Sequence, residues 1–397
     1  MKPKAISTTP ESADLTDGRQ GLIVLGMHRS GTSALSGALN RCGVWLGSEF
    51  DLTGANRENP KGFFERKDVR AVCDALLRSV DSDWWKIAEF RIEAIPQGDL
   101  IKCGRAFQEV IAKLGRQSST WAIKEPRLCL LFPALQSYIP HPVCILMHRN
   151  PLEVARSLRV RNGFGLAEGL ALWEAYNLYA LRASQGFRRV LISYEELRSA
   201  PSDAVARLFQ KLAHKYDVKL TGVDIQAVND FISPELHRQQ SDAHDTEAFL
   251  TPSQQTLWRQ LQNGEALEFD NLHDLPQAAR EILSDLEARK HYQDQLHNRK
   301  NRFGQLSIHT RGGEEVEDRL LELRTKLASS DARVAALHSS MSWRVTTPLR
   351  MLSFSVRRTI DYVANFLPSR VGALTRRSRV SSRCAGVRGS QRIGEKD

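Results

Sequence analysis

Short apolar runs alternate with helically spaced apolar positions between residues 20 and 215. The run GLIVL at 21–25 is continuous and ends at Gly26, which is typical of a strand buried on both faces. From 34 to 42 the apolar residues repeat at helical spacing until Gly43 ends the pattern. Further strands are predicted at 120–123, 143–147 and 190–192, and further helices at 67–80, 104–114, 152–161, 165–184 and 202–212. This alternation predicts an α/β fold in three layers, with helices on both faces of a central parallel sheet.

The C-terminal part of the chain has a different pattern. Residues 296–313 are interpreted as a linker, and from 314 to 341 apolar residues, with Ser330 as the polar member, recur at steps of three and four. That spacing predicts a coiled coil, through which the chain would form a homo-oligomer. A single amphipathic helix folded back on the domain is the alternative. We therefore expect a domain at 20–295, between a disordered N-terminus at 1–19 and a basic, partly disordered tail at 342–397.

The net charge of +10 is concentrated in that tail. Residues 341–397 hold twelve Lys or Arg and three Asp or Glu, which leaves the preceding 340 residues at +1. This distribution argues against a basic body that binds nucleic acid. Because the tail also carries apolar residues, it suits peripheral contact with an anionic membrane surface.

Other features of the composition favour a cytoplasmic protein. No apolar run reaches the roughly 18–20 residues that cross a bilayer, and the first twenty residues have no apolar core. The six cysteines are scattered without CxxC spacing, which favours free thiols over a disulfide framework or a metal site. We expect no metal cofactor.

The segment GMHRSGTS, from Gly26 to Ser33, lies between the first strand and the first helix. A helix N-terminus has unpaired N–H groups and a partial positive charge, so it binds anions. Gly31 allows close approach of the backbone, and Ser30, Thr32 and Ser33 carry hydroxyl groups. The structural alternative is a Gly/Ser turn that caps a helix.

The loop also fits G-x-x-x-x-G, so a P-loop kinase or NTPase is a second hypothesis. In that motif a Lys follows the last glycine and reaches the β- and γ-phosphates of the nucleotide. Here Thr32 follows, and the cation lies earlier, at Arg29. The loop is therefore poorly suited to ATP but still able to hold another phosphate-like group.

With these residues the chain resembles the sulfotransferases that use 3'-phosphoadenosine-5'-phosphosulfate (PAPS), whose loop is P-[KR]-S-G-T-[TS]. His28 to Ser33 match it except at the proline position, where this chain has His28. The resemblance implies that residues 29–33 hold the 5'-phosphosulfate. It also implies that Arg29 stabilises charge on the bridging oxygen as the S–O bond breaks.

A second segment resembles the 3'-phosphate site of the same family. That site has an Arg after a strand and a Ser eight residues later, and Arg149, Asn150, Pro151 and Ser157 match it without a gap. Taken alone, the segment could be an N-capped helix with a surface arginine.

Two weaker matches follow the same order along the chain as in the family. Lys124, in IKEPR, corresponds to the active-site lysine, and Tyr194, in ISYEEL, to a tyrosine near the nucleotide. The resemblance covers about residues 20–215. It implies a P-loop-type fold and a PAPS-dependent sulfotransferase (EC 2.8.2 type) with PAPS as co-substrate and its 3',5'-bisphosphate (PAP) as product.

The catalytic base is not given by this resemblance. The animal cytosolic members have a histidine two residues after the lysine, where this chain has Pro126. Carbohydrate and tyrosine sulfotransferases use a carboxylate, and our candidate is Glu65 in NPKGFFE, since a carboxylate beside buried aromatics suits a base. A glutamate that satisfies a helix N-terminus is the alternative. Other candidates for the base are Glu125, Glu49, Asp51 and His28.

The acceptor is a hydroxyl compound whose identity the sequence does not fix. Arg127 is a candidate contact to the sulfuryl group or an acidic acceptor, with a surface ion pair as the alternative. Trp84 and Trp85 are candidates for acceptor binding, although tryptophans are more often core residues. The segment SWRVTTPLR at 342–350 resembles one found in bacterial glycosyltransferases, which favours a carbohydrate or surface polysaccharide precursor. A coiled-coil scaffold with an inactive α/β domain is the non-enzyme alternative.

Overall fold

The computed structural model describes residues 20–57, 59–220, 222–232, 246–267 and 274–309, together with 321–323, 325–326 and 328–329. The chain divides into two compact units, Met1–Leu296 and His297–Asp397. The expected disordered N-terminus, most of the heptad segment, Cys384 and the basic tail lie outside the described residues.

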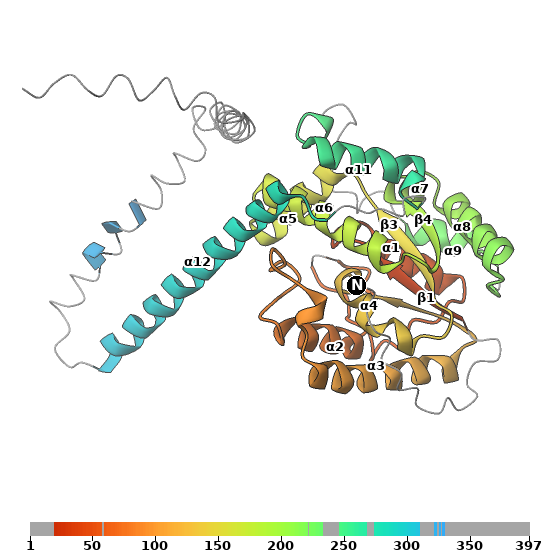
Figure 1. The fold of residues 1–397 in the computed structure, drawn as a ribbon, viewed down its shortest axis with the longest axis horizontal. Helices are drawn as coiled ribbons and strands as arrows, with labels where there is room; N and C mark the ends of the chain where they lie inside the picture. Colours follow the sequence, from red (N-terminus) through yellow and green to blue (C-terminus); the bar gives the residue numbers. More distant parts are fainter. Residues whose placement is uncertain are drawn as a thin grey trace, which may run out of the picture. The chain divides into compact units, whose positions relative to one another are not determined.

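The first unit is built on a four-stranded parallel sheet, whose strands lie among the helices in Figure 1. Its strands are β1 (Gln20–Leu25), β2 (Thr120–Lys124), β3 (Val143–His148) and β4 (Arg188–Ser193), in the order β2-β1-β3-β4. All four predicted strands are confirmed. In register, β1 pairs Ile23 with Ile123 of β2 and with Cys144 of β3.

Helices cover both faces of the sheet, which confirms the three-layer prediction. Ile23 and Leu25 belong to one core, which they share with the helices α2 to α6, α11 and α12, whose ranges are given below. Leu22 and Val24 belong to a second core, which they share with α1 and with α7 to α9. Because side chains alternate along a strand, a continuous apolar run such as β1 supplies both cores. The α-helices are α1 (Thr32–Arg41), α2 (Lys67–Arg78), α3 (Gln97–Gln117), α4 (Leu128–Leu135), α5 (Pro151–Asn162), α6 (Leu166–Ala183), α7 (Tyr194–Ser199), α8 (Pro201–Tyr216), α9 (Ile225–Phe231), α11 (Pro252–Asn263) and α12 (Gln277–His309).

The predicted helices are confirmed, with differences at their ends. The third helix, α3, begins at Gln97 and not at 104. The leucine-rich helix α4 was not predicted, because nearly all its side chains are buried and no polar face marks its period.

Near the C-terminus, α12 continues as a helix to His309, through most of the segment that the sequence analysis interprets as a linker. Within the predicted coiled coil, the described residues 321–323, 325–326 and 328–329 are helical. The five cysteines in the described part of the chain are buried free thiols.

Candidate active site

The carboxyl ends of the four strands meet at one edge of the sheet and bring the sequence motifs together. β1 leads into Gly26 and the phosphate loop, β2 ends at Lys124, β3 is followed by Arg149, and β4 by Tyr194. β2 lies on one side of β1 and β3 on the other, so the strand order reverses at β1. Open parallel sheets bind ligands at the carboxyl edge beside such a reversal.

The phosphate loop has two residues in the left-handed region, Arg29 and Gly31, and only the glycine adopts it without strain. Gly31 has φ +89°, and a Cβ added there would lie 2.2 Å from Cδ2 of Tyr194. Arg29 also lies in the left-handed region, with φ +70°, which is a strained conformation for a residue with a side chain. Among the described residues no side chain caps α1, so the N–H groups of its first turn are available to an anion.

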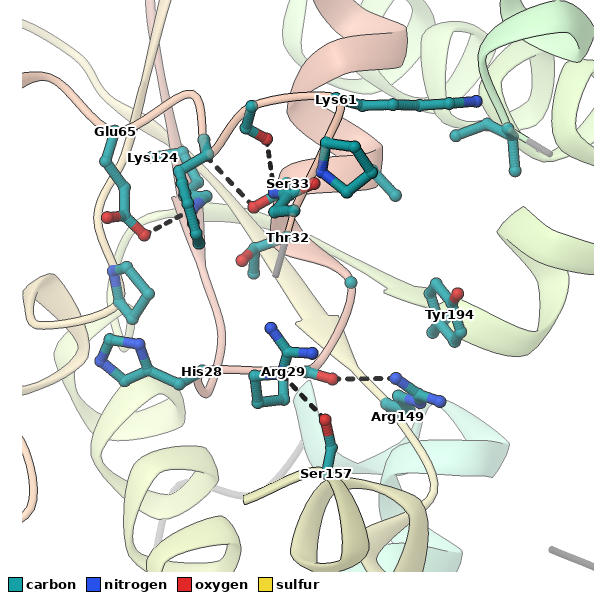
Figure 2. Close-up of a pocket in the computed structure, with 18 of the residues that line it drawn as sticks. His28, Arg29, Thr32, Ser33, Lys61, Glu65, Lys124, Arg149, Ser157 and Tyr194 are labelled. Atoms are coloured by element: carbon teal, nitrogen blue, oxygen red, sulfur yellow. Dashed lines mark hydrogen bonds and ion pairs between the residues drawn. The ribbon is translucent and has the colours of Figure 1, made fainter. Parts of the chain in front are cut away.

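Arg29 joins the loop to the second motif. Its Nε donates to Oγ of Ser157 at 2.8 Å, and its carbonyl oxygen accepts from Arg149 at 3.1 Å (Figure 2). Arg149 is also bound to Glu153 at 2.7–2.8 Å, and its guanidinium lies 4.4 Å from the ring centre of Tyr194. The two segments that resemble the two phosphate sites therefore form one junction.

Local helix chemistry places Arg149 at this junction. Asn150 caps α5 through its side-chain oxygen, and Pro151 occupies the first helical position, where its missing N–H costs nothing. The indole Nε1 of Trp173 donates to the carbonyl oxygen of Arg149 at 3.0 Å. Since Ser157 lies two turns further along α5, it returns to the same side as Arg149.

Lys124 and Glu65 form a buried ion pair at the other side of the close-up in Figure 2. Nζ of Lys124 lies 2.7 Å from Oε1 of Glu65, and the two side chains are 2% and 9% exposed. Such a pair holds the carboxylate in one orientation. A bound hydroxyl group reaching this carboxylate would find a proton acceptor already in place.

The segment before α2 positions Glu65. Phe64 has φ +57°, and Thr53 exchanges backbone hydrogen bonds with residues 63 and 65. Oγ of Ser33 donates to the carbonyl oxygen of Phe63 at 3.1 Å, which ties this segment to the start of α1. Arg66, only 1% exposed, anchors the segment from behind through Asp68 and Asp51.

These residues line one pocket. Its lining includes nine of the residues that the sequence analysis placed at the site: Arg29, Gly31, Thr32, Ser33, Glu65, Lys124, Arg149, Ser157 and Tyr194. Five Lys or Arg side chains and one carboxylate line it, so the pocket is strongly cationic.

Apart from His28, which is also in the lining, the remaining predicted residues lie behind or beside it. Ser30 is fully buried, and its hydroxyl has no partner among the described residues. Arg127 is 5% exposed and pairs with Glu125 at 2.8 Å and Asp74 at 2.9 Å, so its charge is used inside the protein. This is the ion-pair alternative, in a buried rather than a surface form.

Trp84 and Trp85 border the pocket through His28. The ring centres of His28 and Trp84 are 4.6 Å apart, and Phe164 lies 5.8 Å from Trp84 and 6.4 Å from Trp85. Both tryptophans are half-buried. They are therefore neither full core residues nor part of the lining itself.

The other candidate carboxylates have partners or positions that do not suit a base. Lys113 and Ser48 bind Asp51 and hold the pKa of its carboxyl well below the usual range. Burial raises the pKa of Glu125, but this fully buried side chain is bound to Arg127 and lies outside the lining. Glu49 is exposed and is not part of the lining.

His28 lies in the lining as a neutral side chain. Burial, and then the nearby charges of Arg127, Lys124, Arg161 and Arg29, lower its pKa well below the usual value. Its Nε2 is buried and has no hydrogen-bond partner among the described residues.

Sequence reasoning missed several residues of the lining, among them Arg161, Lys61 and Phe231. Arg161 lies one turn after Ser157 on the same side of α5, a spacing that could have suggested it. Lys61 and Phe231 meet across 170 positions, with Nζ of Lys61 donating to the carbonyl oxygen of Phe231 and lying 5.2 Å from its ring. No local pattern marks that contact.

No cluster of three His, Cys, Asp or Glu side chains has the geometry to hold a metal ion in the described part of the chain. None of the helices described is both long enough and apolar enough to span a bilayer.

A comparison with models of protein families agrees with the motifs. The model of the "Sulfotransferase family" matches residues 21–217, and no curated protein matches the chain. Among solved structures, the chain is similar to the sulfotransferase domain from the curacin biosynthetic pathway (14% identity, 68% of this chain and 98% of that one, TM-score 0.31). It is also similar to the sulfotransferase domain of the Synechococcus PCC 7002 olefin synthase (15%, 70% and 98%, 0.32) and to sulfotransferase STF9 from Mycobacterium avium (16%, 64% and 78%, 0.33).

The matched region holds all the strands of the sheet, the phosphate loop and the Arg29–Ser157–Arg149 junction. The chain belongs to the sulfotransferase family, whose members transfer sulfuryl groups.

Proposed function

We propose that this protein transfers a sulfuryl group from PAPS to a hydroxyl group of a carbohydrate or surface polysaccharide precursor. The observation that carries the proposal is the Arg29 junction, where the loop suited to a phosphosulfate and the Arg149–Ser157 pair suited to a phosphate open into one pocket. A donor with two anionic groups on one nucleoside requires two such sites side by side.

The charge of the pocket supports the same donor. PAPS carries about four negative charges, counting about two on its 3'-phosphate. The lining holds five cationic side chains and one carboxylate. In this proposal residues 29–33 bind the 5'-phosphosulfate, Arg149 and Ser157 bind the 3'-phosphate, and Tyr194 lies against the nucleotide.

PAPS, when bound, supplies the sulfuryl group and the leaving phosphate. Glu65 accepts the proton of the acceptor hydroxyl as its oxygen bonds to sulfur, while the bond from sulfur to the bridging oxygen breaks. The electron pair of that bond stays with the leaving phosphate, where Arg29 and Lys124 stabilise the charge. The ion pair at 2.7 Å supports these two roles, because it keeps base and cation adjacent.

The aromatic rings near His28 support a carbohydrate acceptor. Trp84 and Trp85 are half-buried, and Trp84 lies against His28 of the pocket lining; aromatic faces of this kind suit the apolar side of a sugar ring. The further hint to a glycan, the segment 342–350, lies outside the described residues. Homo-oligomerisation through 314–341 and membrane contact through 342–397 remain proposals on the same sequence grounds.

A calorimetric titration with PAP, AMP and ATP tests the donor assignment. We expect PAP to bind more tightly than AMP, and Arg149→Ala to weaken PAP by about 10- to 100-fold through the loss of charge-assisted hydrogen bonds. Arg159→Ala is the matched control, since it removes the same charge from an exposed position on α5. Equal affinities for PAP and AMP would contradict the 3'-phosphate site, and Mg²⁺-dependent binding of ATP would favour the kinase or NTPase hypothesis.

A further inference from the structure

Three aromatic side chains lie together beside the pocket, and we call them the acceptor wall: the half-buried Trp84 and Trp85 and the buried Phe164. Trp84 and Trp85 belong to the segment between α2 and α3, whereas Phe164 lies at the corner between α5 and α6. Phe164 is the ring at which the two segments meet, at 5.8 and 6.4 Å from the tryptophans. The wall reaches the pocket through the contact of Trp84 with His28.

The segment that carries the tryptophans has little structure of its own. Between Ser79 and Pro96 it contains one short 3-10 turn, Ile92–Ala94. Backbone groups that are buried without a partner are costly, so such a segment needs partners from elsewhere. Tyr176 of α6 supplies one, as its hydroxyl donates to the carbonyl oxygen of Trp84 at 2.6 Å.

The beginning of α12 supplies two more. Oε1 of Glu287 accepts from the N–H of Ala88 at 2.8 Å, and Arg280 donates to the carbonyl oxygen of the same residue at 3.0 Å. Both backbone groups of Ala88 are therefore bound by side chains about 190–200 positions away. Leu283 and Leu286, on the buried side of α12, join the core that contains Ala88.

The same helix also holds the other half of the wall. Arg289 binds both carboxylate oxygens of Glu168 at 2.6 Å, and Glu168 in turn caps α6 directly after Phe164. Nζ of Lys290 lies 5.3 Å from the ring centre of Phe164. One stretch of α12, from Arg280 to Lys290, thus contacts both segments that form the wall.

We infer that α12 is the positioning element of the acceptor side: it fixes the acceptor wall through Ala88 and Glu168 and leaves the donor side unaffected. No residue of α12 is among those that line the pocket. Arg29, Arg149 and Ser157 are held by one another and by α5. The inference rests on the proposed function in treating the tryptophans as an acceptor surface.

Glu287→Ala tests the inference, with Glu287→Gln as rescue and Glu281→Ala as matched control. Glutamine keeps an oxygen that accepts from Ala88, whereas Glu281 is exposed on the same helix and bonds to Gln277. In Glu287→Ala we expect amide hydrogen exchange in residues 82–90 to be about tenfold faster, with the loop at 26–35 unchanged. Near-ultraviolet circular dichroism of the tryptophans should change in this variant alone.

Donor and acceptor measurements separate this role from general destabilisation. PAP affinity should stay within about twofold of wild type in all three variants. With the hydroxyl acceptor found in a glycan screen, Glu287→Ala should raise KM about tenfold and leave kcat within about twofold. Unchanged exchange in residues 82–90, or a parallel loss of PAP affinity, would overturn the inference.

PAP binding tests the proposed function, whereas amide exchange and circular dichroism test the role of α12. A wild-type protein that does not bind PAP contradicts the donor assignment, while the exchange and circular dichroism results still decide the role of α12. Should Glu287→Ala not fold, Arg280→Ala removes only the bond to the carbonyl oxygen of Ala88 and is judged by the same exchange measurement.

Discussion

The Lys124–Glu65 pair gives the sharpest test of the proposed chemistry. The two side chains are almost fully buried and 2.7 Å apart. Each charge therefore replaces the water that the other charge loses on burial. Lys124→Met leaves a buried carboxylate without its cation, and we expect a loss of about 3–5 kcal/mol in the free energy of unfolding. Glu65→Gln keeps an oxygen that accepts from Lys124, so its cost should be smaller, about 1.5–3 kcal/mol.

A double-mutant cycle measures the pair itself. We expect a coupling of about 1–3 kcal/mol between the two substitutions, because each single change leaves a buried charge without its counter-charge. Urea unfolding at pH 7 of wild type, both single variants and the double variant supplies the four free energies. Additive losses would refute the assignment of a mutually compensating pair.

Turnover distinguishes a catalytic base from a structural carboxylate. Glu65→Gln removes the proton acceptor but preserves size and hydrogen bonding, so kcat should fall by about 10²- to 10⁴-fold while PAP affinity changes little. Glu49→Gln is the control, since this exposed carboxylate precedes the same segment. Retained turnover in Glu65→Gln, measured as transfer of labelled sulfate from PAPS, would remove Glu65 as the base.

Two further predictions concern the loop and the strand beside it. Gly31→Ala should cost about 2–4 kcal/mol of stability and abolish measurable PAP binding, because it adds backbone strain and a Cβ that collides with Tyr194. The control Gly163→Ala, at φ +68° in open space, should cost only about 1–2 kcal/mol in urea unfolding. Equal losses of stability in the two variants would show that the contact with Tyr194 is unimportant. Burial lowers the pKa of His148 to about 4, so between the ordinary value of 6.5 and pH 4 the unfolded chain binds a proton that the folded chain does not. Stability should therefore fall by up to about 3 kcal/mol as the pH decreases through this window, and His148→Gln should flatten the fall in urea midpoints measured from pH 7 to pH 4.5; an unchanged slope would contradict the burial argument.

Much of the fold was predictable because the sheet is parallel and buried. Continuous apolar runs mark its strands, and helically spaced apolar residues mark the helices that have one exposed side. The helix α4 was not predicted, because it is buried on nearly all sides and its sequence therefore lacks the polar positions that would mark a helical period. α12 was not predicted for the opposite reason: beyond the buried Leu286 its sequence becomes highly polar, so no apolar period marks this part of the helix.

The site was predictable where it depends on the ends of strands. Arg29, Lys124, Arg149 and Tyr194 each follow or end a parallel strand, and parallel topology alone brings such positions to one edge. Contacts between distant irregular segments lack this geometric rule. The binding of Phe231 by Lys61 therefore has no signature in the sequence.

The choice among carboxylates shows what burial and pairing add to a motif. The sequence favours Glu65 through the motif NPKGFFE but leaves Asp51 and Glu125 as alternatives. In the structure Asp51 forms an ion pair with Lys113 outside the pocket lining, and Glu125 forms an ion pair with Arg127. Glu65 is the carboxylate of the lining, paired with the one lysine that the family motif identifies. A proton acceptor must reach the substrate, so access to the pocket, which no sequence pattern encodes, is the physical ground for preferring Glu65.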